Sequence, residues 1–198
     1  SRVTLRTVEQ CERDRRVLAG VRNRPEFRHT MGFDAPWPGG RVEAFLESAQ
    51  AEESSHNLFV CLPEEGAPKK PLESEATGAA EAATGPAGAP MIVGGVDLFD
   101  VDRVSSTLAY WLFEDYRGEG YATEAVSLLL DHAFGELGLH RVEAKTFAGN
   151  DASRAFLEGL DFVHEGTARE CRITDGEYGD VHRFALLEDE WTGTEAGR

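Results

Sequence analysis

The sequence predicts an α/β protein in which helices pack on a mixed β-sheet. Short alternating or apolar segments have the length of strands, and other segments carry apolar residues at helical spacing. The two kinds interleave in the order β-α-α-β-β-β-α-β-α-β-β. With 198 residues, the chain has the size of one domain with a substantial core. We therefore expect residues 1–198 to form a single domain.

The predicted strands are bounded by glycine, proline or polar residues. They cover residues 3–8, 56–62, 91–99, 107–113, 141–147, 162–173 and 181–187. Helical spacing predicts helices over residues 9–20, 41–48 and 122–137, and Asn150 can cap a further short helix. The stretch between the first two helices contains Pro25, Pro36 and Pro38 and is expected to be a loop.

Residues 64–90 differ in composition from the rest of the chain. Pro, Gly, Ala and Glu dominate there, and Leu72 is the one large apolar residue. Such a stretch cannot bury enough surface to offset the entropy lost on ordering. Because strands resume on both sides, we expect a flexible insertion in a hairpin and not a domain boundary.

The charge of the chain excludes some classes of function. A formal net charge of −16 disfavours nonspecific binding to nucleic acids or anionic membranes, which need clustered basic residues. Lysines are few beside arginines, so the acidic surface fits a cytoplasm at high salt, where charges are screened beyond ~3 Å near 1 M. A halophilic origin is therefore a hypothesis. Attraction of a basic substrate is the weaker alternative, because the acidic residues are scattered.

Targeting and metal-binding patterns are absent from the sequence. No apolar run approaches the ~20 residues of a membrane span, and the N-terminal residues lack the apolar core of a signal peptide. We therefore expect a cytoplasmic protein. The cysteines Cys11, Cys61 and Cys171 lie far apart, so their spacing offers no zinc or disulfide framework.

A glycine-containing loop, Arg117–Ala122, lies between a predicted strand and a predicted helix. A helix N-terminus presents unpaired N–H groups and about half a positive charge, which suits an anion. Gly118 and Gly120 let the backbone approach that anion closely, and Arg117 can add a charge-assisted hydrogen bond. On these residues alone, an ordinary strand-to-helix turn is an equal alternative to a pyrophosphate site.

The surrounding residues exclude two common phosphate sites. A Gly-Lys-Ser/Thr triplet is missing, so a nucleoside triphosphate loop of the Walker type is disfavoured. A dinucleotide fingerprint would need glycine at Thr123, and it would follow the first strand of the fold.

The segment from Tyr110 to Ala125 closely resembles the acetyl-CoA loop of the GNAT acetyltransferases. Within that superfamily it is similar to the RimJ/RimL branch, which acetylates the N-termini of ribosomal proteins. Residues 133–144, an Asn-x-x-Ser motif at 150–153 and a closing Glu190-Trp191 extend the resemblance over residues 91–191. It is weak over residues 3–62 and excludes the insertion. The family usually has glycine where this chain has Asp161, which implies a changed turn near the thiol end of the cofactor.

The resemblance implies a mostly antiparallel sheet of six to seven strands, splayed between the fourth and fifth strands near Phe113 and Phe147. Acetyl-CoA would be the cosubstrate, without a metal. Its pantetheine arm would lie between the splayed strands and its pyrophosphate on the loop amides. The residues that the resemblance assigns to the cofactor are Leu112, Phe113, Arg117, Gly118, Glu119, Gly120, Tyr121, Ala122, Thr123, Asn150, Ser153 and Phe156.

The implied reaction is direct attack of a primary amine on the thioester in a ternary complex. It needs a deprotonated amine and an acid for the departing thiolate. Glu114 is the candidate base. The alternatives are that Glu114 is an ordinary solvated carboxylate at the end of the strand and that a water chain accepts the proton. Ser153 is the candidate acid by family analogy, and an ordinary first-turn serine is the alternative. Asn150 would contact the pantetheine, act as a helix cap, or do both.

The acceptor expected from the resemblance is a protein N-terminal amine. An α-amino group with a pKa of ~8 loses its proton far more readily than a lysine at ~10.4. A second hypothesis is that the acceptor is a small amine, such as an amino sugar, polyamine or antibiotic. A third hypothesis is that the chain is a CoA-binding module without catalytic activity. A homodimer is compatible with the resemblance, because dimers are common among similar proteins.

Overall fold

The computed structural model describes residues 1–31, 35–51, 54–63, 83, 85, 88–174 and 176–193. Seven strands form one sheet in the order β1-β2-β3-β4-β5-β7-β6. Neighbouring strands are antiparallel except β4 and β5, which are parallel. The predicted mixed, mostly antiparallel sheet is therefore confirmed. The strands are β1 (Thr4–Thr7), β2 (His56–Leu62), β3 (Met91–Phe99), β4 (Ser105–Leu112), β5 (Arg141–Phe147), β6 (Val163–Thr174) and β7 (Glu177–Leu187).

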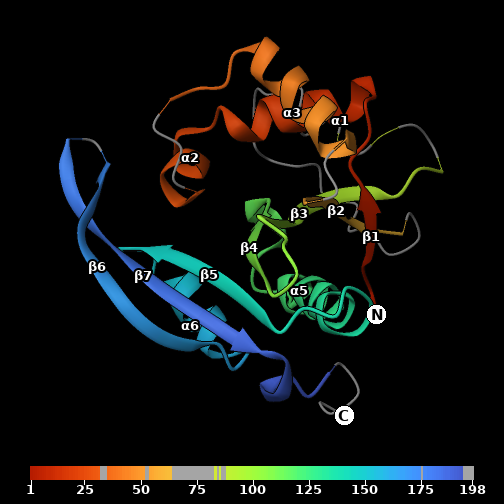
Figure 1. The fold of residues 1–198 in the computed structure, drawn as a ribbon. Helices are drawn as coiled ribbons and strands as arrows, with labels where there is room; N and C mark the ends of the chain where they lie inside the picture. Colours follow the sequence, from red (N-terminus) through yellow and green to blue (C-terminus); the bar gives the residue numbers. More distant parts are fainter. Residues whose placement is uncertain are drawn as a thin grey trace.

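Helices cover both faces of this sheet (Figure 1). One face carries α1 (Glu12–Arg22), α2 (Pro25–Met31) and α3 (Gly39–Ala51). The other carries α5 (Tyr121–Asp131), which continues as a π-helix over His132–Glu136, and α6 (Asp151–Glu158). None of the helices within the described ranges is long and apolar enough to cross a membrane.

Helix α2 corrects the prediction of a loop after the first helix. Pro25 occupies its first helical position, where a fixed φ and a missing N–H do no harm. The turn forms around a hydrogen bond from the Arg28 amide to the Arg24 carbonyl, 3.0 Å long. Phe27 is buried and its ring lies 5.6 Å from that of Trp111. This contact joins residues that are far apart in the sequence, so no local pattern predicts it. It stabilises a seven-residue helix that would be only marginally stable in isolation.

Alternation along β4 sends successive side chains to opposite helical layers. Trp111 points to the layer of α1–α3 and covers Gly95 of β3, where a Cβ atom would lie 2.4 Å from the indole nitrogen. Tyr110 points the other way, and its ring centroid lies 4.6 Å from that of Phe156 in α6. The two neighbouring aromatic residues therefore pack on opposite faces of the sheet.

The sheet opens between β4 and β5. The two strands pair only from Ser105 opposite Arg141 to Leu108 opposite Ala144. Beyond that point β4 stays paired with β3 as far as Leu112, and β5 stays paired with β7 as far as Phe147. The inner edges of the two diverging strands are thus left without a strand partner. The predicted splay between the fourth and fifth strands is confirmed.

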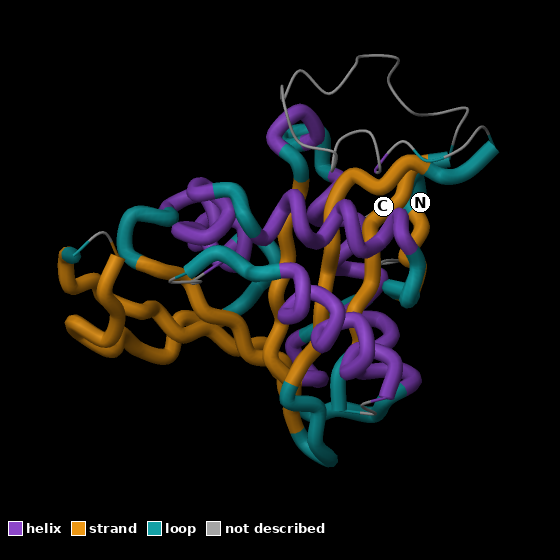
Figure 2. The backbone as a smooth tube through the Cα atoms, turned by 90° about the horizontal axis from the view of Figure 1, so that it is seen from above, coloured by secondary structure: helices purple, strands orange, loops and turns teal. Residues whose placement is uncertain are grey.

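The hairpin of β6 and β7 extends past the helices (Figure 2), and β7 begins at Glu177 where the prediction began at Val181. Its register shifts between Ala168 and Arg172, and Glu170 in this bulge has a φ of 50°. The Glu170 amide donates a 2.9 Å hydrogen bond to the Asp180 carboxylate across the hairpin. A bulge changes the direction of the side chains that follow it, and Arg172 is one of these residues.

Most of the insertion predicted over residues 64–90 lies outside the described residues. Of the described part, Ala83 is buried. The Arg13 guanidinium of α1 donates hydrogen bonds of 2.8 Å to the Ala83 carbonyl and 2.6 Å to the Pro90 carbonyl. These contacts attach the end of the segment to α1, just before β3 begins.

Candidate active site

The glycine loop occupies the place that the sequence predicts, at the N-terminus of α5. Gly118 and Gly120 have φ values of 79° and 82°, and Gly120 caps the helix. Side chains with a Cβ atom rarely adopt these angles, so both glycines are required by the backbone path. The loop residues from Arg117 to Gly120 are exposed, which leaves the helix N-terminus accessible to an anion.

Arg2 braces this loop from the start of the chain. Its Nε and backbone N–H donate to the Glu124 carboxylate at 2.5 and 2.7 Å. Its Nη2 donates to the Glu119 carbonyl at 2.8 Å, and its guanidinium lies 4.8 Å from the centre of the Tyr121 ring. Sequence reasoning missed Arg2, because nothing local links it to a loop more than a hundred residues away.

Arg117 is directed toward the end of β4 in the structure. Its Nε donates to the Leu112 carbonyl at 3.3 Å. Leu112 is partly buried, whereas Phe113 is buried with its ring 5.4 Å from that of Trp111. The residues assigned to the cofactor at the start of the loop therefore lie together, where the strand ends and the splay is open.

The Asn-x-x-Ser motif begins α6, as predicted. Asn150 caps the helix, its Oδ1 accepting a 3.2 Å hydrogen bond from the Ser153 amide. The side-chain NH₂ group of the same residue is a separate donor, so the cap does not prevent contact with a ligand. Ser153 lies in the first turn, with its Oγ 2.6 Å from the Tyr110 hydroxyl oxygen.

Tyr110 joins the predicted residues of α6 to β4. Its hydroxyl meets Ser153, and its ring packs against Phe156. Burial raises the pKa of Tyr110 to about 12, and the Ser153 hydrogen bond opposes that rise. Sequence reasoning missed this role, although alternation along β4 could have placed Tyr110 on the α6 side of the sheet.

The turn after α6 places Asp161 in a backbone conformation that glycine adopts without strain. Asp161 has a φ of 64°, and the amide of the next residue, Phe162, donates to the Leu157 carbonyl at 3.0 Å. Gly159 instead has an ordinary helical φ of −71°. The changed turn expected from the displaced glycine is therefore a left-handed aspartate at the position where glycine is usual.

Glu114, the predicted base, lies in a 3₁₀ turn spanning Glu114–Tyr116. Its side chain is exposed and makes no hydrogen bond or ion pair with the described residues. The structure therefore places Glu114 at the end of β4, but it does not join it to Ser153.

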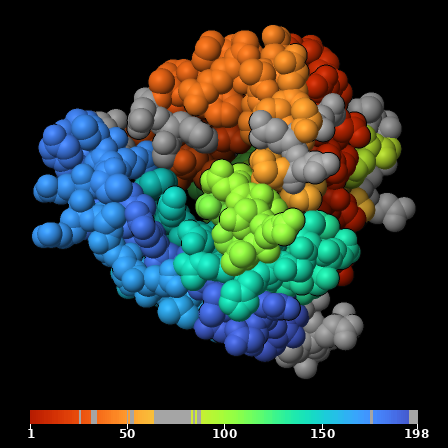
Figure 3. Space-filling view, in the orientation of Figure 1, coloured from red at the N-terminus to blue at the C-terminus, as the bar shows by residue number. Residues whose placement is uncertain are grey.

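Two arginines cover the aromatic rings at the ends of the splayed strands. The Arg172 guanidinium lies 4.0 Å from the centre of the Phe147 ring, and its Nη1 donates to the His29 carbonyl of α2 at 3.1 Å. The Arg24 guanidinium lies 5.6 Å from the centre of the Phe113 ring. Arg172 thus connects the β6–β7 hairpin to α2. Figure 3 shows a hollow between this hairpin, in blue, and the helices near the N-terminus, in orange.

A buried carboxyl group lies behind this region. Asp97 of β3 is paired with Ala109, just beyond the splay point. Burial raises its pKa to about 6, while the charge of Arg22 and a hydrogen bond from the Leu58 amide lower it. Arg22 is itself buried, with its guanidinium 4.6 Å from the centre of the Trp37 ring.

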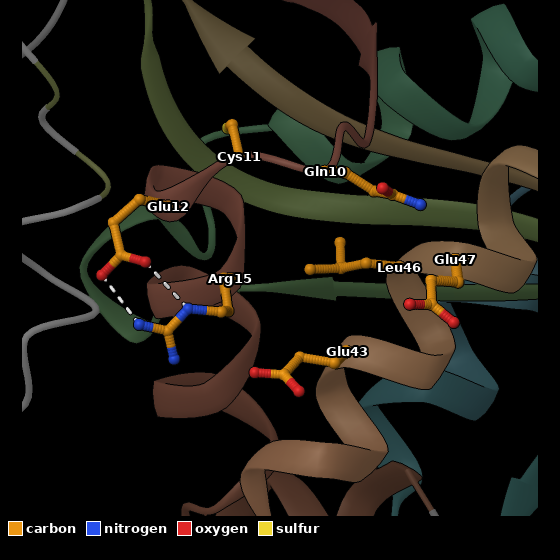
Figure 4. Close-up of a pocket in the computed structure, with 7 residues that line it drawn as sticks. All are labelled: Gln10, Cys11, Glu12, Arg15, Glu43, Leu46 and Glu47. Carbon is orange, nitrogen blue, oxygen red and sulfur yellow. Dashed lines mark hydrogen bonds and ion pairs between the residues drawn. The ribbon is translucent and has the colours of Figure 1, made fainter.

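A separate cavity of about 270 Å³ lies between α1 and α3 (Figure 4). Glu12 and Arg15 are joined by hydrogen bonds at its edge. None of the residues predicted for the cofactor lines it, so it is distinct from the loop and the splay. Its lining residues are Gln10, Cys11, Glu12, Arg15, Glu43, Leu46 and Glu47.

Throughout the described ranges, no group of three or more His, Cys, Asp or Glu residues could hold a metal ion.

Comparison with known proteins identifies a family for this arrangement. The family model for the acetyltransferase (GNAT) domain matches residues 2–163. YdaF of Bacillus subtilis (strain 168), named provisionally as a ribosomal N-acetyltransferase, is 35% identical over 104 residues. That match covers 52% of this chain and 57% of YdaF, so the chain spans little more than half of this relative.

Solved structures show the same fold at low sequence identity. The spermidine N-acetyltransferase of Vibrio cholerae, in complex with CoA and spermine, superposes with a TM-score of 0.77 at 19% identity, covering 96% of this chain and 97% of that one. A GNAT-family acetyltransferase from Bacillus anthracis gives a TM-score of 0.72, also at 19% identity, with coverages of 96% and 97%. Because the family model spans most of the sequence, this chain belongs to the GNAT acetyltransferases.

Proposed function

We propose that this chain transfers an acetyl group from acetyl-CoA to a primary amine, and that the amine is a protein N-terminal α-amino group. One observation carries the proposal: β4 and β5 diverge beside a helix N-terminus opened by two left-handed glycines. This arrangement offers unpaired backbone groups to an extended arm and N–H groups to a pyrophosphate.

Different parts of the chain would bind different parts of acetyl-CoA. The amides of Gly118–Ala122 and the N-terminal end of α5 would hold the pyrophosphate, with Arg2 keeping the loop in place. The inner edge of β4, as far as Leu112 and Phe113, would bind the pantetheine arm as an added strand would. Asn150, the N-cap of α6, and Phe156, whose ring packs on Tyr110, would line the thiol end.

In the proposed reaction, Ser153 donates a proton to the departing thiolate. Glu114 accepts a proton from the amine, directly or through water, since its carboxylate is exposed at the end of β4. The acetyl group moves directly to the amine, so no covalent enzyme intermediate forms.

Two considerations favour a protein N-terminus as acceptor. An α-amine, with a pKa of ~8, needs only a weak base at neutral pH. The resemblance to the RimJ/RimL branch and the provisional name of YdaF point to ribosomal N-termini. A polyamine or another small amine is the second candidate, supported by the fold shared with spermidine N-acetyltransferase.

Release of the free CoA thiol with a panel of amines tests the proposal. The panel contains short peptides with free N-termini, the same peptides with blocked N-termini, spermidine and an amino sugar. We expect turnover only with free N-terminal peptides. Turnover on spermidine or the amino sugar alone would assign a small-molecule acceptor, and cofactor binding without turnover on any amine would indicate a binding module.

The role of Glu114 has its own test. Glu114→Gln should lower kcat by roughly 10–100-fold with little change in CoA affinity, because general bases contribute on this scale. The loss should be greatest near neutral pH, where the acceptor amine still carries its proton. Asp115→Asn, an exposed neighbour in the same turn, is the control. An unchanged pH–rate profile in Glu114→Gln would remove Glu114 as the base.

A further inference from the structure

Two hydroxyl groups meet across the opening between β4 and β5. Tyr110 lies in β4 beyond Leu108, the last residue paired with β5. Its hydroxyl oxygen is 2.6 Å from Ser153 Oγ and 3.3 Å from the Ser153 carbonyl oxygen. The contact joins β4 to the first turn of α6. The pair therefore spans the splay on the side of the sheet that carries α5 and α6.

The direction of this hydrogen bond determines whether the Ser153 hydrogen is free for another acceptor. Either oxygen could donate on distance alone. Burial keeps the Tyr110 phenol protonated at neutral pH, since its pKa is about 12. Its hydrogen needs an acceptor, and Ser153 supplies both oxygens within reach. A 2.6 Å separation is typical of a strong O–H···O bond, and the arrangement in which Tyr110 donates and Ser153 Oγ accepts leaves the Ser153 hydrogen free for another acceptor.

This direction determines where the Ser153 hydrogen can go. Serines in helices often donate to the carbonyl one turn earlier, but within the described ranges Tyr110 is the only residue that bonds Ser153 Oγ. With one lone pair of Oγ taken, the hydroxyl hydrogen points away from Tyr110. The Tyr110 ring cannot easily turn, because it is packed on Phe156 at 4.6 Å.

We infer that Tyr110 is a positioning residue that aims the Ser153 hydroxyl at the leaving thiolate and replenishes its proton. The inference rests on the proposed acetyl transfer and on Ser153 as its acid, and it does not depend on which amine is the acceptor.

The proposed step balances as follows. The amine nitrogen forms a bond to the acetyl carbon, the carbon–sulfur bond breaks, and its electron pair stays on sulfur. The Ser153 proton moves to sulfur, and the Tyr110 proton moves to Ser153 Oγ. The proton released by the amine nitrogen returns to Tyr110 through solvent. The net products are the acetylated amine and the CoA thiol.

A double-mutant cycle on the full chain tests this inference. Tyr110→Phe keeps the ring that packs on Phe156 and removes only the hydroxyl. We expect kcat to fall about 10-fold in Tyr110→Phe and about 100-fold in Ser153→Ala, the scale of general acid catalysis. The double variant should also fall about 100-fold, because Tyr110 acts through Ser153. KM for the amine should stay within about 2-fold in all variants, and Kd for CoA should do so in Tyr110→Phe.

A solvent-isotope measurement separates this role from a structural one. In mixtures of H₂O and D₂O, kcat of the wild type should vary nonlinearly with the D₂O fraction, because two protons move in one step. Tyr110→Phe should give a straight line. Tyr116→Phe is the matched control: its hydroxyl is also buried, but it donates to the Met91 sulfur at 3.1 Å. It should affect thermal stability and leave kcat unchanged.

Other outcomes would overturn the inference. A double variant slowed about 1000-fold would show independent contributions. A Tyr110→Phe enzyme with wild-type kcat, beside a slow Ser153→Ala enzyme, would remove Tyr110 and leave the proposed transfer intact. A Ser153→Ala enzyme with wild-type kcat would remove Ser153 as the acid and the inference with it. Turnover of the wild type on the amine panel reports on the proposed function separately.

Discussion

At the scale of single residues, Gly120 shows how one backbone angle supports a binding site. Its φ is 82°, and a Cβ atom there would lie 3.1 Å from Arg2 Nη2. A valine would add strain of about 1–2 kcal/mol and displace the arginine that braces the loop. Gly120→Val should therefore abolish measurable CoA binding in calorimetry. Gly138→Val is the control, because Gly138 also has a positive φ, of 64°, but lies at the far end of the helical segment. Retained CoA affinity in Gly120→Val would contradict the loop assignment.

Asp97 should leave a signature in the pH dependence of stability. Its pKa rises from 3.8 to about 6 on folding because the carboxyl is buried. The folded state thus holds this proton more tightly, so the contribution of Asp97 is present below pH ~4 and is lost as the pH rises through about 6. Relative to wild type, the unfolding free energy of Asp97→Asn should rise by about 3 kcal/mol between pH 3 and 8, at 1.36 kcal/mol per pKa unit.

Denaturant unfolding of Asp97→Asn and wild type at several pH values checks this prediction. The test uses the change of this difference with pH, so an effect of the substitution that is the same at every pH does not affect it. Asp189→Asn, at an exposed position, serves as the control and should run parallel to wild type. A difference that does not change with pH would mean that Asp97 titrates normally in the folded protein.

At the scale of elements, the end of α6 is held by an aspartate in a left-handed conformation. Asp161 has a φ of 64°, which glycine adopts without strain. Asp161→Gly should therefore raise the free energy of unfolding by about 0.5–1 kcal/mol. Asp161→Ala should lower it, because alanine lacks the local hydrogen bonding that lets aspartate tolerate this region. Thermal unfolding ranks the three proteins, and any order other than Gly, Asp, Ala would refute this account of the turn.

At the scale of the whole molecule, net charge should govern the response to salt. A formal charge of −16 makes the folded chain repel itself, and raising KCl from 0.1 to 1 M shortens the screening length from ~10 to ~3 Å. We expect the midpoint of thermal unfolding to rise by about 3–8 °C, equivalent to ~1–2 kcal/mol for a chain of this size.

Glycerol at matched osmolality is the control for this experiment, because it changes the solvent without screening charge. A midpoint that does not respond to KCl would count against adaptation to high salt. A rise with KCl but not with glycerol would support the halophilic hypothesis that the acidic, lysine-poor composition raises.

The sequence alone determined the elements whose signals are local. Strand β5 was predicted with the bounds that the structure shows, Arg141–Phe147, because its alternating side chains lie between a glycine and a polar turn. The glycine loop and the cap at Asn150 were also visible, since a backbone angle or a cap depends on a few consecutive residues. Family resemblance then supplied acetyl-CoA and the splayed sheet.

Only the tertiary structure decided which distant residues meet. Arg2 reaches the glycine loop, Arg172 reaches α2, and Tyr110 reaches Ser153. None of these contacts has a local signal, because each depends on strand order and on the face that a strand turns toward its neighbours. Helix α2 belongs to the same class, since packing against Trp111 stabilises it in a stretch where Pro25 and the later prolines predicted a loop. The sequence thus located the cofactor loop, and the fold placed beside it the groups that complete the site.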